Sequence, residues 1–140
     1  METKYLHSDL TGRILKAFYK VYNTLGYGFL EKVYQNSMLI ELRTLGVWCS
    51  CELPIKVYYE DHLVGDYYAD ILVEGKVIVE LKAIERLAPE HEVQLVNYLK
   101  GTRTEVGLLL NFGPKPQQVR RVLTHEYLNR IKDADDAERR

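Results

Sequence analysis

Three charged residues lie within two strongly apolar segments, where unpaired charges are costly. Asp70 belongs to "ADILV", residues 69–73, and Glu80 and Lys82 belong to "KVIVELKA", residues 76–83. Two carboxylates 4 Å apart repel each other by about 1 kcal/mol in water and by about 4 kcal/mol at an effective dielectric constant of 20. A raised pKa, the lysine or a metal ion would offset that repulsion. Because carboxylate oxygens are hard ligands, the expected metal is Mg²⁺ or Mn²⁺.

The turn between the two segments decides whether the acids meet. Side chains alternate along a strand, so Glu80 and Lys82 share a face. A two-residue turn at Glu74-Gly75 would put Asp70 on the opposite face. A three-residue turn would put Asp70 on the face of Glu80, and Val73-Glu74-Gly75 suits it because the third residue of such a loop is commonly a left-handed glycine. We expect the three-residue register, which a β-bulge would also restore.

A simpler interpretation is that these charges only solvate a sheet. Glu80 and Lys82 would then form an ion pair on an exposed face, and Asp70 would be an acid at a strand end. An acid-x-Lys sequence is short and common, so it needs structural context before it indicates catalysis.

Two helical motifs supply such context. In "GFLEKVY", residues 28–34, Glu31 and Tyr34 are three apart on one helix face, and Glu31 lies in the first turn, where the helix dipole favours an anion. In "HEVQLVNYL", residues 91–99, Gln94 and Tyr98 are four apart on one face. This second helix directly follows the strand that carries Glu80. Each residue taken singly also has a structural explanation. Glu31 is a favourable residue at the start of a helix, Tyr34 can be a core residue, and Gln94 can be a solvated side chain.

The elements that must position these residues follow from apolar periodicity and turn signals. Periodicity predicts helices over residues 8–25, 30–45, 89–101 and 116–131, and strands over 47–59, 63–73, 76–84 and 105–112. The first three strands read as an antiparallel meander, and Pro54 predicts that the first is an edge strand or carries a bulge. The helix over 89–101 makes a β-α-β crossover, so the third and fourth strands should be parallel. The fold class is therefore α/β, with a mixed central sheet of about four strands flanked by helices.

Size and composition indicate one soluble domain. The chain has 140 residues, which fits a single domain over residues 1–130 followed by a charged tail over 131–140. The net charge of -1 argues against strong non-specific binding to nucleic acid. Two cysteines are too few for a zinc site. No apolar signal segment and no run of about 18 apolar residues is present, so we expect a cytoplasmic protein without a membrane partner.

In this order, the motifs resemble those of known families. "GFLEKVY" matches the pattern that names the GxxExxY protein family, and "AD…VELK…QLVNYL" resembles the core of the PD-(D/E)XK nuclease superfamily, most closely its RecB-like branch. The resemblance covers about residues 8–125 and rests on four ordered elements. It implies a restriction-endonuclease-like core. The sequence departs from the pattern at Ala69, which replaces the proline before the first acid, and it lacks the cysteine cluster that binds iron–sulfur in some RecB-like members.

The resemblance also implies roles for the residues. Asp70 and Glu80 would bind a divalent metal, Mg²⁺ or Mn²⁺, and Glu31 would be the upstream helical acid that joins them. Lys82 would orient or polarise the attacking water and steady charge on the phosphate. Gln94 would position the water, the lysine or the phosphate. The supporting residues would be Tyr34 and Tyr98.

Three functions are consistent with these features. The leading one is a divalent-metal-dependent nuclease that hydrolyses phosphodiester bonds of DNA or RNA with metal-activated water. The second is an inactive module that keeps the fold and binds nucleic acid or a protein partner. The third is a structural or oligomer-forming protein. Nucleic acid is the expected partner, and homo-oligomerisation is left open.

Overall fold

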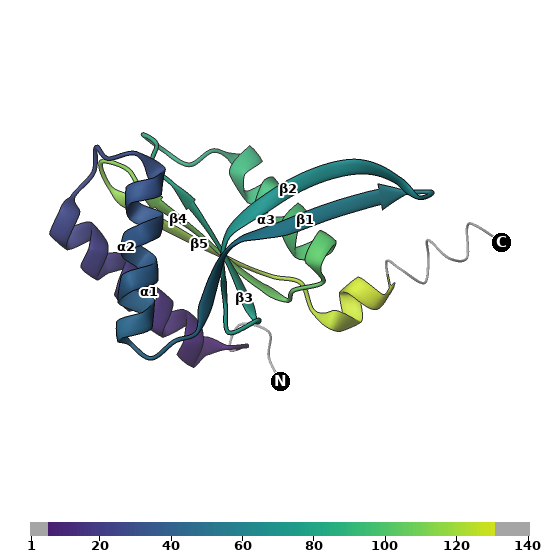
Figure 1. The fold of residues 1–140 in the computed structure, drawn as a ribbon, viewed down its shortest axis with the longest axis horizontal. Helices are drawn as coiled ribbons and strands as arrows, with labels where there is room; N and C mark the ends of the chain where they lie inside the picture. The colour runs from purple at the N-terminus through teal and green to yellow at the C-terminus, as the bar shows by residue number, and fades with distance from the viewer. Residues whose placement is uncertain (1–5, 131–140) are drawn as a thin grey trace.

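The computed structural model describes residues 6–130, and the tail predicted over 131–140 lies outside the described residues. The elements follow the order α1 (Ser8–Leu25), α2 (Glu31–Thr44), β1 (Cys49–Tyr59), β2 (His62–Val73), β3 (Val77–Lys82), α3 (Pro89–Thr102), β4 (Val106–Phe112) and β5 (Pro116–Val122) (Figure 1). Residues 125–130, the last that the structure describes, are helical and follow β5. Of the helices between residues 6 and 130, none combines the length and apolar character needed to cross a membrane.

The sheet is mixed, as predicted, but within residues 6–130 it has five strands rather than about four. Its order is β1-β2-β3-β4-β5. The first three strands are antiparallel neighbours, β3 and β4 are parallel, and β4 and β5 are antiparallel. The predicted meander and β-α-β crossover are therefore confirmed. β1 lies at an edge, which is where its internal Pro54 is tolerated.

The fifth strand corrects the sequence-based prediction of a helix over residues 116–131. Residues 116–122 form β5, and within the described part of this segment the helix covers only residues 125–130. β4 is buried along its whole length and pairs with β3 on one edge. Its other edge would leave buried backbone groups unpaired, and β5 pairs with it from Val106↔Val122 to Phe112↔Pro116. Pairing with the sheet thus overrides the helical periodicity of this segment.

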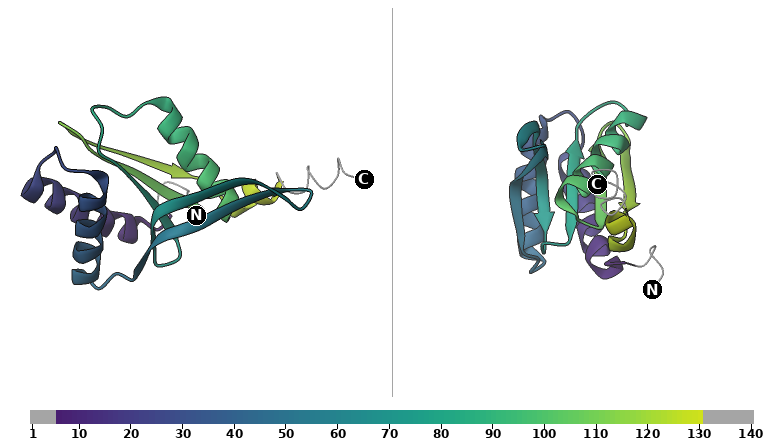
Figure 2. Two further views of the ribbon diagram at one scale, coloured as in Figure 1. Left: turned by 45° about the horizontal axis from the view of Figure 1, so that its top comes forward. Right: turned by 90° about the vertical axis from the view of Figure 1, so that its right-hand side faces the viewer.

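Helices cover both faces of the sheet. α1 and α2 pack on one face, in a core that includes Phe18, Tyr34 and Phe112 (Figure 2). α3 packs on the other face, where Leu95 and Leu99 join a second core. These two layers place the first residues of α2 and the middle of α3 around β2 and β3, the strands that carry the acids.

β1 and β2 extend beyond the rest of the sheet as a two-stranded arm. They have 11 and 12 residues, whereas β3 has six. β2 pairs with β3 only over Ile71–Val73, so the remainder of β2 pairs with β1 alone. Figures 1 and 2 show the two strands projecting together from the body of the molecule. We call residues 52–70 the arm, and the point where β3 leaves β2, at Asp70 and Glu80, the fork.

Candidate functional site

The β2–β3 hairpin has the predicted three-residue register. The strands pair through Ile71↔Val79, Leu72↔Ile78 and Val73↔Val77. The loop is Glu74–Lys76, one residue later than the predicted Val73–Gly75. Within it, the Lys76 N–H donates to the Val73 carbonyl (2.9 Å), and Glu74 and Gly75 both have left-handed backbone, with φ of 53° and 65°. Because of this register, Asp70 lies across from Glu80.

At the fork, the two acids replace main-chain pairing with side-chain hydrogen bonds. The Asp70 N–H donates to Glu80 Oε1 (2.9 Å), and the Leu81 N–H donates to Asp70 Oδ2 (2.7 Å). The second oxygen of each carboxylate makes no hydrogen bond with any residue between 6 and 130. The two carboxylates are therefore fixed in the gap between the strands, and each keeps one oxygen for another partner.

The backbone is irregular beside the fork. β1 and β2 pair on both sides of Glu52 and Asp70, but these two residues do not pair, and Glu52 has a φ of 55°. Ile71 packs in the core beneath α1 and α2, and the adjacent Asp70 lines a pocket with residues of the same α2 helix. The alternation of faces therefore breaks at Asp70. A left-handed non-glycine residue costs on the order of 1–3 kcal/mol, and such strain is concentrated at functional sites.

A pocket of about 360 Å³ opens next to Asp70. Its lining residues come from the start of α2 and the base of the arm: Glu31, Lys32, Gln35, Glu52, Tyr68 and Asp70. We call it the acidic pocket. Gln35 Nε2 donates to the Asp70 carbonyl (2.9 Å), and Lys32 Nζ lies 2.8 Å from Glu52 Oε1. Four of these residues, Lys32, Gln35, Glu52 and Tyr68, are not among the predicted site residues, although the four-residue spacing from Glu31 to Gln35 is a signal for one of them.

The "GFLEKVY" motif fixes the entry into α2. Tyr34 is fully buried, and its ring stacks on Phe112 with centroids 4.2 Å apart. Its hydroxyl donates to the Gly26 carbonyl (2.6 Å) and accepts from the Phe29 N–H (3.2 Å). Gly28, with a φ of 110°, allows the chain to turn there. Together these contacts hold the loop before α2, so that the helix begins with Glu31 at the acidic pocket.

We expect Tyr34→Phe to destabilise the protein by about 1–3 kcal/mol, because it removes two partly buried hydrogen bonds of the hydroxyl. Denaturant unfolding measures the change. Tyr127→Phe is the matched control, since no hydrogen bond of the Tyr127 hydroxyl exists among residues 6–130. Equal stability of the Tyr34→Phe and natural proteins would show that the hydroxyl does not hold the loop.

Burial and mutual repulsion act on three carboxyl groups around the fork. Burial, and next the charge of Asp70, raise the pKa of Glu80 to about 8, and Glu80 is only 5% exposed. Burial is also the main cause that raises the pKa of Asp70 and of Glu31. The charge of Lys82 opposes the rise of the pKa at all three acids. These residues therefore form one electrostatic cluster, in which the charge of Lys82 acts on all three carboxylates.

Two residues of α3, Tyr98 and Gln94, were predicted to lie near these acids, and they differ in position. Tyr98 is 6% exposed, and burial followed by the charges of Glu80 and Asp70 raises the pKa of its phenol to about 12. Tyr98 is thus close enough to sense both acids. Gln94 lies one turn earlier and lines a different cavity, of about 250 Å³, between α3 and the arm. The structure gathers Glu31, Asp70, Glu80 and Lys82. Tyr98 borders this cluster and also lines the cavity that contains Gln94.

The donor chemistry of the fork fits a hard divalent cation. Asp70 and Glu80 each keep one carboxylate oxygen free of hydrogen bonds to the described chain, and Glu31 shares the acidic pocket with Asp70. Such oxygen ligands suit Mg²⁺ or Mn²⁺. Across residues 6–130, no three His, Cys, Asp or Glu side chains are gathered closely enough to hold a metal ion as they stand. The Asp70–Glu80 pair is therefore the fixed part of the candidate site, and Glu31 is the third acid within electrostatic range.

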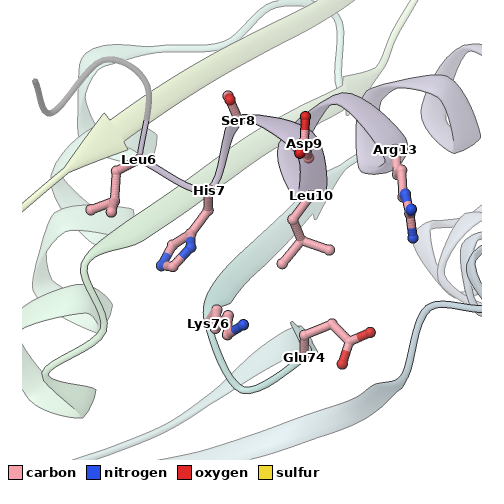
Figure 3. Close-up of a pocket in the computed structure, with 8 residues that line it drawn as sticks. All are labelled: Leu6, His7, Ser8, Asp9, Leu10, Arg13, Glu74 and Lys76. Carbon is pink, nitrogen blue, oxygen red and sulfur yellow. The ribbon is translucent and has the colours of Figure 1, made fainter. Parts of the chain in front are cut away.

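A larger cavity, of about 610 Å³, lies at the opposite end of the β2–β3 hairpin. Figure 3 shows it between the start of α1 and the hairpin loop, with His7 directed toward Lys76. Its charged lining mixes both signs, Asp9 and Glu74 against Arg13 and Lys76. Because its charges balance and its acids are exposed, this cavity lacks the buried, coupled groups that mark the fork as the candidate site.

Comparisons with known proteins add a family and a distant structure. A family model described as the PD-(D/E)XK nuclease superfamily matches residues 8–122. A solved structure, titled "Crystal structure of SSO0001", aligns with 73% of this chain at 16% sequence identity and a TM-score of 0.49. The aligned part is 55% of that chain, so this chain spans less than two thirds of its length. No curated protein matches the sequence.

Proposed function

The chain belongs to the PD-(D/E)XK nuclease superfamily, and from this premise we propose that it is a divalent-metal-dependent nuclease that hydrolyses phosphodiester bonds of DNA or RNA. We also propose that it falls within the RecB-like branch, as a GxxExxY protein. The observation that supports the activity most strongly is the Asp70–Glu80 pair at the fork, whose carboxylates are locked by two backbone hydrogen bonds. Two neighbouring acids, one of them buried, repel each other at a cost to stability, and a bound cation would offset that repulsion.

The proposed metal ligands are Asp70, Glu80 and Glu31. Bound there, Mg²⁺ or Mn²⁺ would lower the pKa of a water and neutralise charge on the phosphate. The protein's contribution is to hold the carboxylates in place and to limit the rise of their pKa. Lys82 supports this by lowering the pKa of all three acids. The Gln35 hydrogen bond to the Asp70 carbonyl steadies the irregular backbone from which the Asp70 carboxylate projects.

Lys82 has a second proposed role, at the reacting phosphate. It is partly buried at the end of β3 and makes no ion pair within 4 Å among residues 6–130. Its ammonium group is therefore available to orient the attacking water and to stabilise negative charge that develops on the phosphate. Gln94 is proposed to reach the substrate from the α3 side, and Tyr98 to hold that helix against the acids.

The experiment that tests this function is a panel of single- and double-stranded DNA and RNA, incubated with the pure protein and Mg²⁺ or Mn²⁺. We expect at least one substrate to be nicked or degraded, and EDTA to stop the reaction. Binding without cleavage in every metal would instead support an inactive nucleic-acid-binding module. If the protein neither binds nor cleaves any of these substrates, both functions are contradicted.

A further inference from the structure

We propose that the acidic pocket takes a single unpaired nucleotide, with its base stacked on Tyr68, so that the substrate is single-stranded nucleic acid. This inference rests on the proposed nuclease function and specifies its substrate. The new observation is that an aromatic side chain, Tyr68, and a lysine, Lys32, line the same small pocket as Asp70.

Tyr68 is placed as a stacking surface. It lies two residues before Asp70 on β2, lines the acidic pocket and is 59% exposed. Its ring stacks on no other aromatic ring among residues 6–130, whereas its neighbour Tyr67 packs against Tyr98 with centroids 5.8 Å apart. The cross-strand partner of Tyr68 is Pro54, whose ring restricts the backbone behind it. A rigid strand thus presents an unoccupied aromatic face beside the proposed metal ligands.

The opposite wall of the pocket offers a cation. Lys32, the second residue of α2, reaches across to Glu52 at 2.8 Å, and both side chains are well exposed. An exposed ion pair stabilises a protein by at most about 1 kcal/mol. Lys32 can therefore leave Glu52 and bind a phosphate at a small cost in free energy. The pocket therefore provides a flat apolar face for a base and a lysine for the adjoining phosphate.

Charge and size favour a single strand over a duplex. Duplex binding draws most of its affinity from many phosphate contacts. Among residues 6–130, however, Lys32 is the one cation that lines this pocket, beside three carboxylates. In single strands, base stacking on aromatic side chains contributes about 1–3 kcal/mol per base, which replaces part of the affinity that phosphate contacts supply to a duplex. A volume of about 360 Å³ suits one nucleotide rather than a double helix. A paired base would first have to leave its stack, at a cost of a few kcal/mol.

Fluorescence anisotropy with labelled oligonucleotides tests the inference independently of cleavage. The Glu80→Gln protein in EDTA, which should not cut, is titrated with single-stranded DNA, single-stranded RNA and a blunt DNA duplex. We expect at least one single strand to bind more than about tenfold more tightly than the duplex. Adding Tyr68→Ala should weaken that binding by roughly 5- to 150-fold, the stacking contribution of one base, whereas adding Tyr68→Phe should preserve it.

Tyr59→Ala is the matched control, because Tyr59 is on the same arm, is also 59% exposed and lies outside the acidic pocket. Its binding should be unchanged. Equal affinity for duplex and single strand, an unaffected Tyr68→Ala variant, an equal loss in Tyr59→Ala or no binding at all would each overturn the inference. If the natural protein still cleaves a duplex with Mn²⁺, the nuclease function stands while the single-strand inference fails.

Discussion

Glu80→Gln is expected to stabilise the metal-free protein at pH 8 by a few kcal/mol. Burial and the charge of Asp70 raise the pKa of Glu80 from an ordinary value of 4.5 to about 8 in the folded state. The folded state therefore binds this proton more tightly than the unfolded state, and stability falls as pH rises from 4.5 to about 8. Each pKa unit corresponds to about 1.4 kcal/mol. Glutamine carries no charge and keeps an oxygen to accept the Asp70 N–H, so it avoids the loss.

Urea unfolding in EDTA at pH 4.5 and pH 8 measures this effect. The gain from Glu80→Gln should be large at pH 8 and should disappear near pH 4.5. Glu60→Gln is the control, because Glu60 is an exposed acid at the tip of the arm. A Glu80→Gln protein that is less stable than the natural protein at pH 8 would mean that Glu80 is not buried and repelled as described. The same variant should lose metal-dependent cleavage, so stability and function would move in opposite directions.

Lys82→Ala is expected to reduce cleavage by at least about 100-fold without unfolding the protein. Removal of one preorganised donor to developing charge typically costs about 100- to 1000-fold in rate. Loss of the lysine also removes the charge that lowers the pKa of Glu31, Asp70 and Glu80. The fold should persist because Lys82 makes no ion pair with the described residues.

Steady-state cleavage with Mn²⁺, together with a thermal melt, checks this prediction. Lys76→Ala is a matched control in the same hairpin, since Lys76 is exposed in the loop at the opposite end. It should cut at the natural rate. If the Lys82→Ala preparation cleaves as fast as the natural protein, the activity comes from a contaminating nuclease or from a site elsewhere on the molecule.

Much of this site follows from local rules. Strand alternation places Glu80 beside Lys82, and the glycine-containing turn favours the register that brings Asp70 across from Glu80. The three-residue spacing of Glu31 and Tyr34 predicts that they lie on the same face of a helix. These inferences hold because each depends on a few neighbouring residues. The hairpin loop was predicted one residue too early, because Glu74 accepts a left-handed backbone that sequence rules reserve for glycine.

The remainder depends on contacts between distant segments. Glu52 and Tyr68 reach the acidic pocket because the β1–β2 ladder breaks at Asp70, and alternation alone does not reveal such a break. β5 forms because the backbone groups on the second edge of buried β4 need hydrogen-bond partners. The helical periodicity of residues 116–131 gives no sign of this requirement. Gln94 was grouped with the acids by its place on α3, and in the structure it lines a cavity next to them that it shares with Tyr98.

The central claim is that the acids of the fork form a metal-dependent phosphodiesterase site. Its most direct test is the cleavage rate of Asp70→Asn against that of the natural protein, purified identically and assayed with Mn²⁺ and with EDTA. Asparagine keeps an oxygen to accept the Leu81 N–H, so the fork remains intact. The natural protein should cut only with Mn²⁺, and folded Asp70→Asn should not cut. Cleavage by Asp70→Asn at the natural rate, or cleavage that persists in EDTA, would contradict the claim.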